Sequence, residues 1–425
     1  MRVADVLDHT AAAPVAELGT LRDVVESLAG LDRTPCSPGE REAASWIARR
    51  LRSVGVGVEN VVLEEEPSWG TFLPQITGLG ALGVLSALLA VAGRRRLATC
   101  CAGVTVAGIV DEAQNGPRLL RRAVRRRRST VNVVAELGNP LAARTLVVHA
   151  HHDAAQTGRF YDQSLMIALH RRRPELMARM KRQLPQWWLG LLAPLGALAT
   201  SALGRRSPAL AGALVGSLAV AAAAEIWRSP TVPGANDNLS GVAALLALAE
   251  MVRERPLGDL RLLLVSCGAE ETLQDGIRAF VASHRHELPP ERTWFLNLDQ
   301  VGSPNLVMLE GEGPIWMEEH TDASFRDLIA DVARGHGIEL ERGLHARAST
   351  DTVIPSRAGY GSAFIGSLTD WRVPANYHLM SDTPENLDYG AVARATALAY
   401  GVAERLAYGV AERLAAGPPE GDRRS

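Results

Sequence analysis

Five short polar clusters in this 425-residue sequence carry histidines and carboxylates in an order that could bind metal ions. They are HAHHDA at 149–154, PGANDNLSG at 233–241, SCGAEET at 266–272, NLDQVG at 297–302 and YHLMSDT at 377–383. Imidazoles and carboxylates without a set of cysteines suit hard or borderline divalent ions such as zinc, manganese or cobalt. Each cluster lies near the end of a predicted strand, and the carboxyl ends of strands form the binding crevice of an open α/β sheet. We therefore predict that the clusters converge on a metal site.

The first two clusters contain residues with distinct predicted roles. His151 and Asp153 are two residues apart at a strand end, so their side chains point to the same side and the carboxylate can orient the imidazole. Asp237 lies in a tight Gly/Asn turn before a helix that we expect Ser240 to cap. Such a turn would fix a carboxylate able to bridge two metal ions.

The other three clusters could complete the site. Glu270 and Glu271 are neighbours with diverging side chains, so one can bind a metal while the other faces the metal-bound water as general base. Asp299 follows an apolar strand, and His378 is followed by Asp382, which could support it. One His or Asp at a strand end is usually a capping or solvated residue. Five such clusters in one chain favour catalysis.

The segments between these clusters predict an α/β fold. Strands are expected at 56–62, 132–137, 145–150, 260–267, 293–298 and 362–366, and helices at 18–31, 38–53, 240–255, 275–286, 321–335 and 388–416. Ser37 is the expected N-cap of the helix at 38–53. This alternation is typical of a central sheet with helices on both faces.

Four charge-free apolar segments interrupt this pattern, at 72–92, 97–110, 187–204 and 208–224. A bilayer core of about 30 Å requires roughly 20 helical residues. We predict two helical hairpins in a membrane, with the shortest segment, 97–110, fitting least well. Tryptophans at 187, 188 and 227 lie where an aromatic belt would form. Two hairpins buried within a soluble protein, or lying at an interface, are the alternative.

Basic residues on the two sides of these segments predict an orientation. Arginines 94–96 and 205–206 join the paired segments, whereas many more basic residues lie on the other side, at 118–128 and 171–182. The positive-inside rule then places the catalytic part on the cytoplasmic side of a bacterial membrane. Arg121 to Arg128 could bind anionic lipid headgroups or form a solvated arm. The first ten residues lack the apolar run of a signal peptide, and a net charge of −2 gives no reason to expect a nucleic-acid partner.

Together, these motifs resemble the co-catalytic di-zinc exopeptidases, a family that includes secreted bacterial leucyl aminopeptidases and glutamate carboxypeptidase. The resemblance spans about 21–388 without the apolar inserts, and includes RTPCSPGEREAASWIARRLRSVGV, NVVAELGNP and the five clusters. It implies the zinc exopeptidase fold with a mixed, mostly parallel sheet, and two divalent metal ions, with zinc as the expected metal. His151 and Asp299 would bind one ion, Glu271 and His378 the other, and Asp237 would bridge them.

The resemblance also implies a catalytic base and supporting residues. Glu270 would be the general base, and Asp153 would support His151. Thr350–Asp351 stands where the family usually has a Ser-Asp pair, and Asp382–Thr383 matches its usual Asp-Thr pair; both would support the site rather than bind metal. No GxSxG or HExxH motif is present, and the GxGxxG at 78–83 lies in an apolar segment where close helix packing explains it.

The chain departs from the family in one respect. An apolar insert separates the His-x-Asp and Asn-Asp-Asn motifs, which in the family are close in sequence, and this leaves substrate access open. We expect one peptidase domain at 1–417, a first hairpin with a basic arm at 72–128, a second hairpin at 159–229 and a disordered tail at 418–425.

The predicted function is a membrane-associated aminopeptidase that acts on peptide or aminoacyl substrates, with the lipid bilayer as a second partner. A carboxypeptidase or an N-acyl amide deacylase would use the same site. The stretch between Asp299 and His378 leaves little room for the lid of a related carboxypeptidase and deacylase family. A non-catalytic membrane receptor or scaffold is the alternative from another class, but it has no need for an intact ligand set.

Overall fold

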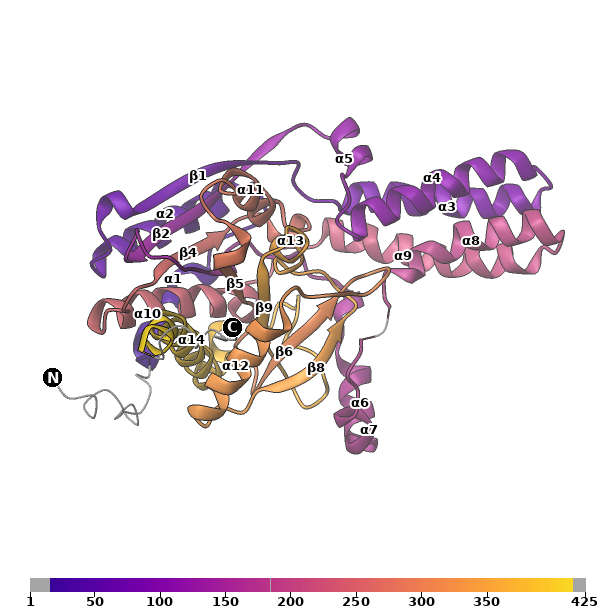
Figure 1. The fold of residues 1–425 in the computed structure, drawn as a ribbon. Coiled ribbons are helices and arrows are strands. Elements are labelled where there is room, and N and C mark those ends of the chain that lie inside the picture. The colour runs from indigo at the N-terminus through magenta and orange to yellow at the C-terminus, as the bar shows by residue number, and fades with distance from the viewer. Residues whose placement is uncertain (1–15, 184, 416–425) are drawn as a thin grey trace, which may run out of the picture.

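A computed structural model describes residues 16–183 and 185–415, in which nine strands form one mixed sheet (Figure 1). The order is β1-β2-β4-β3-β5-β9-β6-β7, with β8 beside β6. The centre, from β4 to β9, is parallel, and β1, β2 and β6 join antiparallel at the two sides. The strands are β1 (Val61–Ser68), β2 (Arg128–Gly138), β3 (Thr145–His151), β4 (Arg261–Cys267), β5 (Thr293–Leu298), β6 (Asn305–Glu312), β7 (Glu318–Glu319), β8 (Glu341–Ala346) and β9 (Gly361–Leu368).

Helices cover both faces of the sheet, which confirms the predicted α/β fold. The larger core lies under α1 (Leu18–Ala29), α2 (Pro38–Ser53), α10 (Ser240–Glu254), α12 (Ala323–Gly335) and α14 (Tyr389–Ala415). The opposite face packs against α11 (Asp275–Ser283) and α13 (Val353–Arg357). Helix α10 is buried along nearly its whole length, because it lies between the sheet and the helices α1 and α14.

Most predicted elements form, with a few corrections. Ser37 caps α2 as expected, since its hydroxyl accepts a hydrogen bond from the Glu40 amide at 3.1 Å. The strand expected at 56–62 is wrong: Val58–Asn60 form a 3₁₀ turn, and β1 begins only at Val61. Strands β6, β7 and β8 and the short helices α5 (Leu119–Val124), α6 (Ser164–Arg172), α7 (Pro174–Ala178) and α13 were not expected. The predictions for the first ten residues and for the tail at 418–425 concern residues outside those that the structure describes.

The four apolar segments form four helices that project together from one end of the sheet (Figure 1). We call these helices the arm: α3 (Leu73–Val91), α4 (Arg95–Ala113), α8 (Trp188–Leu203) and α9 (Ser207–Arg228). Small residues allow close packing, and a Cβ on Gly80 would lie only 2.7 Å from Val220. The glycines at 80 and 83 thus serve helix packing, as predicted. The domain limits at 72–128 and 159–229 remain predictions.

Large apolar side chains cover the outside of the arm. Leu85, Leu88, Leu210 and Leu214 are each between 47% and 68% exposed. Helices α3 and α9 are long and apolar enough to cross a membrane, and α8 is apolar but shorter. Only 33% and 28% of their most apolar windows are buried, so these helices do not resemble the core helices of the sheet. Such an apolar surface supports membrane association.

Candidate active site

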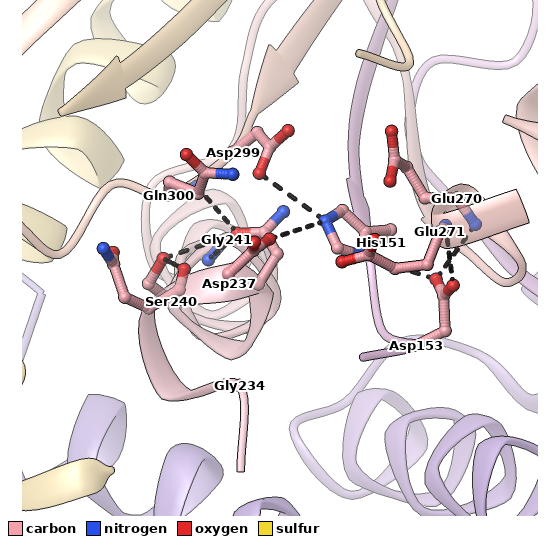
Figure 2. Close-up of polar contacts among 12 residues, drawn as sticks. His151, Asp153, Gly234, Asp237, Ser240, Gly241, Glu270, Glu271, Asp299 and Gln300 are labelled. Carbon is pink, nitrogen blue, oxygen red and sulfur yellow. Dashed lines mark hydrogen bonds and ion pairs between the residues drawn. The ribbon is translucent and has the colours of Figure 1, made fainter. Parts of the chain in front are cut away.

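Residues of four of the five polar clusters lie together at the carboxyl ends of the parallel strands (Figure 2), and the fifth cluster adds His378. His151 ends β3, Glu270 and Glu271 form the turn after β4, and Asp299 follows β5. Asp237 comes from η4 (Ala235–Leu239), the turn that leads into α10. The loop after β9 supplies His378, so four of the five predicted ligands come from strand ends or the loops that follow strands, and Asp237 comes from the turn before α10.

Asp237 lies between two groups of predicted ligands. Its Oδ1 is 3.2 Å from His151 Nε2, which in turn is 3.5 Å from Asp299 Oδ1. Its Oδ2 is 3.0 Å from His378 Nε2, which is 3.3 Å from Glu271 Oε1. The two carboxylate oxygens thus face two separate pairs, as the sequence predicts for a bridging ligand.

These distances fit metal binding. Two ligand atoms on a tetrahedral zinc ion are about 3.3 Å apart when each bond is about 2.0 to 2.1 Å. Ligand atoms of His151, Asp237 and Glu271 all lie within 4.8 Å of one another. Asp299 Oδ1 and Asp237 Oδ2 are buried without a hydrogen-bond partner. A cation would provide the partner that these oxygens lack.

Burial gives this site unusual proton affinities. Burial raises the pKa of Asp299 to about 6, against the effect of His151. It also raises the pKa of Glu270 well above its usual value, and the neighbouring Glu271 adds to this shift. The pKa of Asp237 is low despite burial, because the imidazoles of His151 and His378 lie beside its carboxylate. Crowded buried carboxylates of this kind are stabilised when a divalent cation is bound.

Asp153 connects His151 to the turn at Glu270–Thr272, which carries the predicted base and is the predicted catalytic turn. Its Oδ1 lies 3.4 Å from His151 Nδ1 and accepts a hydrogen bond from the Glu270 amide at 3.0 Å. Its Oδ2 accepts from the Glu271 amide at 2.9 Å (Figure 2). One carboxylate therefore fixes both an imidazole and the turn that carries the two glutamates.

The turn that holds Asp237 is fixed by Asp382 and Asn238. Asp382 accepts hydrogen bonds from the amides of Asn236 and Asp237 at 2.7 and 3.1 Å, a supporting position close to the one expected. The predicted capping role of Ser240 is wrong. Its hydroxyl donates to the Asn236 carbonyl, whereas the Asn238 side chain accepts from the Gly241 amide at 3.0 Å. Asn238 takes this position because its carbonyl oxygen reaches an amide three residues ahead.

Two buried residues that the sequence motifs did not reveal also shape the site. Arg33 donates to the carbonyls of His152 and Pro233 at 2.9 and 2.8 Å, so it ties together the loops that carry two predicted ligands. Glu40 accepts from the Ala269 amide at 2.8 Å, immediately before the catalytic turn. Both lie in the RTPCSPGE segment of the resemblance, but their partners are more than a hundred residues away in sequence.

Two further contacts come from regions where no site residue was expected. Gln274 donates to Glu270 Oε1 at 2.7 Å. Tyr161 lies in the second insert, and its ring meets the His378 ring edge-on with 4.5 Å between centroids. Thr350 donates its amide to Glu312, and Asp351 lies 3.9 Å from His149 on the buried side of the site.

Within the run at 121–128, Arg121 differs from both expected forms, and Arg118, just before the run, is buried like it. Arg121 is fully buried, where it pairs with Glu112 at 2.5 Å and donates to the Thr272 carbonyl at 2.6 Å. Arg118 is also buried and pairs with Asp275. These arginines therefore neither face lipid headgroups nor form a solvated arm. Arg122, Arg126 and neighbouring residues are exposed. For them, contact with lipid headgroups or a solvated arm stays a prediction.

This geometry agrees with comparisons to known proteins. Residues 219–403 match the model of Peptidase family M28. This part of the chain is thus similar to peptidase family M28, and the resemblance predicted from the sequence is confirmed. The match begins within the second insert and includes four of the five predicted metal ligands.

Individual relatives agree with this assignment. The chain is 26% identical over 208 residues to a probable lipoprotein aminopeptidase, LpqL, of Mycobacterium tuberculosis, an alignment that covers 43% of this chain and 42% of that protein. A Zn-dependent exopeptidase from Parabacteroides distasonis shares the fold, with a TM-score of 0.52 and 14% identity over 92% of this chain and 99% of that one. A glutaminyl cyclase from an Acidobacteriales bacterium also shares the fold, with a TM-score of 0.54 and 12% identity over 94% of this chain and 98% of that one.

Proposed function

We propose that this protein is a membrane-associated aminopeptidase that uses two divalent metal ions, with zinc as the expected metal, and Glu270 as general base. The position of Asp237 between the His151–Asp299 pair and the His378–Glu271 pair is the observation that carries the proposal. Bound metal ions would polarise the scissile carbonyl and lower the pKa of a water molecule.

The chain's own residues would move the proton. Glu270 is buried beside the ligands, and its Oε1 already accepts a hydrogen bond from Gln274. Its other oxygen can then take a proton from the attacking water and deliver it to the leaving amine. Asp153 holds the backbone of this turn, which keeps the base from moving toward the ligand positions.

The arm would anchor the enzyme in a bacterial membrane, with the catalytic part on the cytoplasmic side. Its distal turns carry Arg94 to Arg96 and Arg205 to Arg206, fewer basic residues than the base of the arm carries. Labelling of single cysteines in these turns from outside intact cells tests this orientation. Access only from the cytoplasm would contradict it.

The catalytic proposal is tested by Glu270→Gln and His378→Ala, assayed on leucine amide and on N-acetyl-leucine. Glu270→Gln keeps the volume but removes the base, so we expect turnover to fall by about 100-fold or more while about two metal ions per chain remain bound. His378→Ala should lose about one ion, which metal analysis measures. Normal turnover in Glu270→Gln would contradict the mechanism.

The choice of substrates separates the alternatives. Cleavage of leucine amide alone supports an aminopeptidase, whereas cleavage of N-acetyl-leucine alone would favour the deacylase that uses the same site. A wild-type protein that binds the metal ions but cleaves neither these compounds nor dipeptides would favour the receptor or scaffold.

A further inference from the structure

One continuous cavity of about 770 Å³ joins the candidate metal site to the base of the arm. At one end it is lined by the predicted ligands and the base, including His151, Asp237 and Glu270. At the other end it is lined by α3 and α9. Its volume lies within the range of cavities that hold small organic ligands. A molecule bound at the metal site can therefore extend along the arm without leaving the cavity.

The wall along the arm offers no hydrogen bonds. Among the described residues, those of α3, α4, α8 and α9 that line the cavity all have apolar side chains or are glycines. On α9 they include Val215, Leu218, Ala219, Val220, Ala222 and Ile226. Along α3 and α9, which supply most of this wall, the interior backbone amides and carbonyls bond within the helices themselves. A ligand in this part of the cavity can gain binding free energy only by burying apolar surface.

This wall discriminates between a peptide and a hydrocarbon chain. Each peptide unit that entered it would bury an amide and a carbonyl without partners, which is costly. An alkyl chain has no such groups, and each of its methylene groups that leaves water strengthens the binding of the chain. At the metal-site end of the cavity, the scissile bond must lie next to the proposed base, Glu270.

We propose that the substrate is an amide with a long, unbranched alkyl chain on one side, and that this chain lies along α9 and the start of α3. The proposal rests on the proposed function, because it places the scissile amide at the same metal site. A chain of this kind is also soluble in the bilayer that the arm would occupy, so the substrate could reach the site from the membrane. The alkyl chain can lie on the leaving amine or on the acyl group.

Two series of substrates separate these two sources of the chain. Leucine N-alkylamides, from ethyl to decyl, place the chain on the leaving amine, and N-acyl-leucines, from acetyl to decanoyl, place it on the acyl side. We expect kcat/KM to rise along one series by up to about fourfold per methylene. Ala222→Trp should fill the arm end of the cavity and reduce the preference for decyl or decanoyl over the shortest chain at least tenfold.

Ala221→Trp is the matched control, because Ala221 is exposed on the same helix and does not line the cavity. It should keep the chain-length preference of the wild type. Ala222→Leu is a smaller change for the case in which the tryptophan prevents folding, and we expect an intermediate loss. An equal preference in Ala221→Trp, Ala222→Leu and Ala222→Trp would overturn the proposal.

Binding of decylamine and butylamine tests the cavity independently of turnover. We expect decylamine to bind the wild type and Ala221→Trp more tightly than butylamine, and to bind Ala222→Trp at least tenfold more weakly. Partitioning into detergent affects both tryptophan variants equally and cancels in this comparison. If decylamine binds no better than butylamine, the inference fails even when short leucine amides are cleaved. If decylamine binds as expected but no amide is cleaved, the proposed function fails instead.

Discussion

The two hairpins of the arm join the catalytic part in different ways. The first hairpin continues into a buried polar joint: Glu112, Asn115, Arg118 and Arg121 are each at most 4% exposed. At the base of the second hairpin the corresponding pair lies at the surface and within the insert itself: Arg159 and Glu225 lie 3.5 Å apart, and the Arg159 side chain is 93% exposed. Both joints contain an arginine–carboxylate pair, but only one of them is shielded from water.

The buried joint leads directly to the proposed base. Asn115 donates to the Gln274 side chain at 2.8 Å, and Gln274 donates to Glu270 at 2.7 Å. Arg121 binds the carbonyl of Thr272, within the turn that carries Glu270 and Glu271. The second hairpin instead contributes α9 to the wall of the cavity and Tyr161 to the surroundings of His378.

This difference indicates a division of labour between two inserts that look alike in sequence. Buried charge-assisted hydrogen bonds fix geometry, because neither partner can turn to water instead. Exposed pairs contribute little and allow small movements. We infer that the first hairpin positions the catalytic turn in addition to lining the cavity through α3, whereas the second contributes to the space for the substrate alone.

The largest expected effect is at Arg121. Arg121→Ala leaves the Glu112 carboxylate buried and unpaired, so we expect the free energy of unfolding to fall by about 3 to 5 kcal/mol. Urea unfolding of the purified protein in detergent measures this. Arg126→Ala is the control, because Arg126 is exposed in the same charge run, and it should change stability by less than about 0.5 kcal/mol.

A double variant checks the cause of this loss. Glu112→Leu with Arg121→Met removes both charges and keeps much of the volume, so it should recover part of the stability that Arg121→Ala loses. Equal losses in Arg121→Ala and Arg126→Ala would show that the first joint is no more rigid than a solvated arm.

Arg121 also shows where prediction from the sequence ends. The five polar clusters and the apolar helices were predictable, because each is a local pattern whose meaning needs only its neighbours in the chain. The burial of Arg121 was not, since a run of arginines has the same local pattern whether it is solvated or paired. Its partner Thr272 lies about 150 residues away in sequence, and only the folded chain brings the two together.

The same limit applies inside the site. His151 and Asp237 could be predicted because few roles suit a histidine or an aspartate in those motifs. Glu40 and Gln274 could not, because glutamate and glutamine in helical or turn segments are usually solvated. Ser240 was misassigned because a serine before a helix is a common cap, whereas Asn238, two residues earlier, makes the bond to the helix.

Asn115 should show a smaller effect, which is measured on catalysis. Asn115→Gly removes the hydrogen bond to Gln274, together with those to Ser349, Arg118 and Arg278, but tolerates the positive φ of 55° at this position. Because Gln274 then holds Glu270 less firmly, we expect kcat on leucine amide to fall by about tenfold with little change in KM. Steady-state kinetics measure both constants.

The control for Asn115 is Asn139→Gly, which removes an exposed asparagine from the loop between β2 and β3. It should leave kcat within about twofold of the wild type. If kcat falls equally in both glycine variants, the first hairpin does not position the catalytic turn. The proposed division of labour would then be wrong.

The smallest effect is expected at the exposed joint, with Arg159→Ala. The guanidinium of Arg159 is almost fully in water, so its loss should cost about 0 to 0.5 kcal/mol of unfolding free energy. The Arg159 amide donates to both oxygens of Glu225, at 3.2 and 3.3 Å, and alanine keeps this amide. The backbone at this joint should therefore stay in place, and kcat should change by less than about twofold. Since Arg121→Ala and Arg159→Ala make the same chemical change at the two joints, similar losses of stability in the same urea experiment would mean that burial does not distinguish the hairpins.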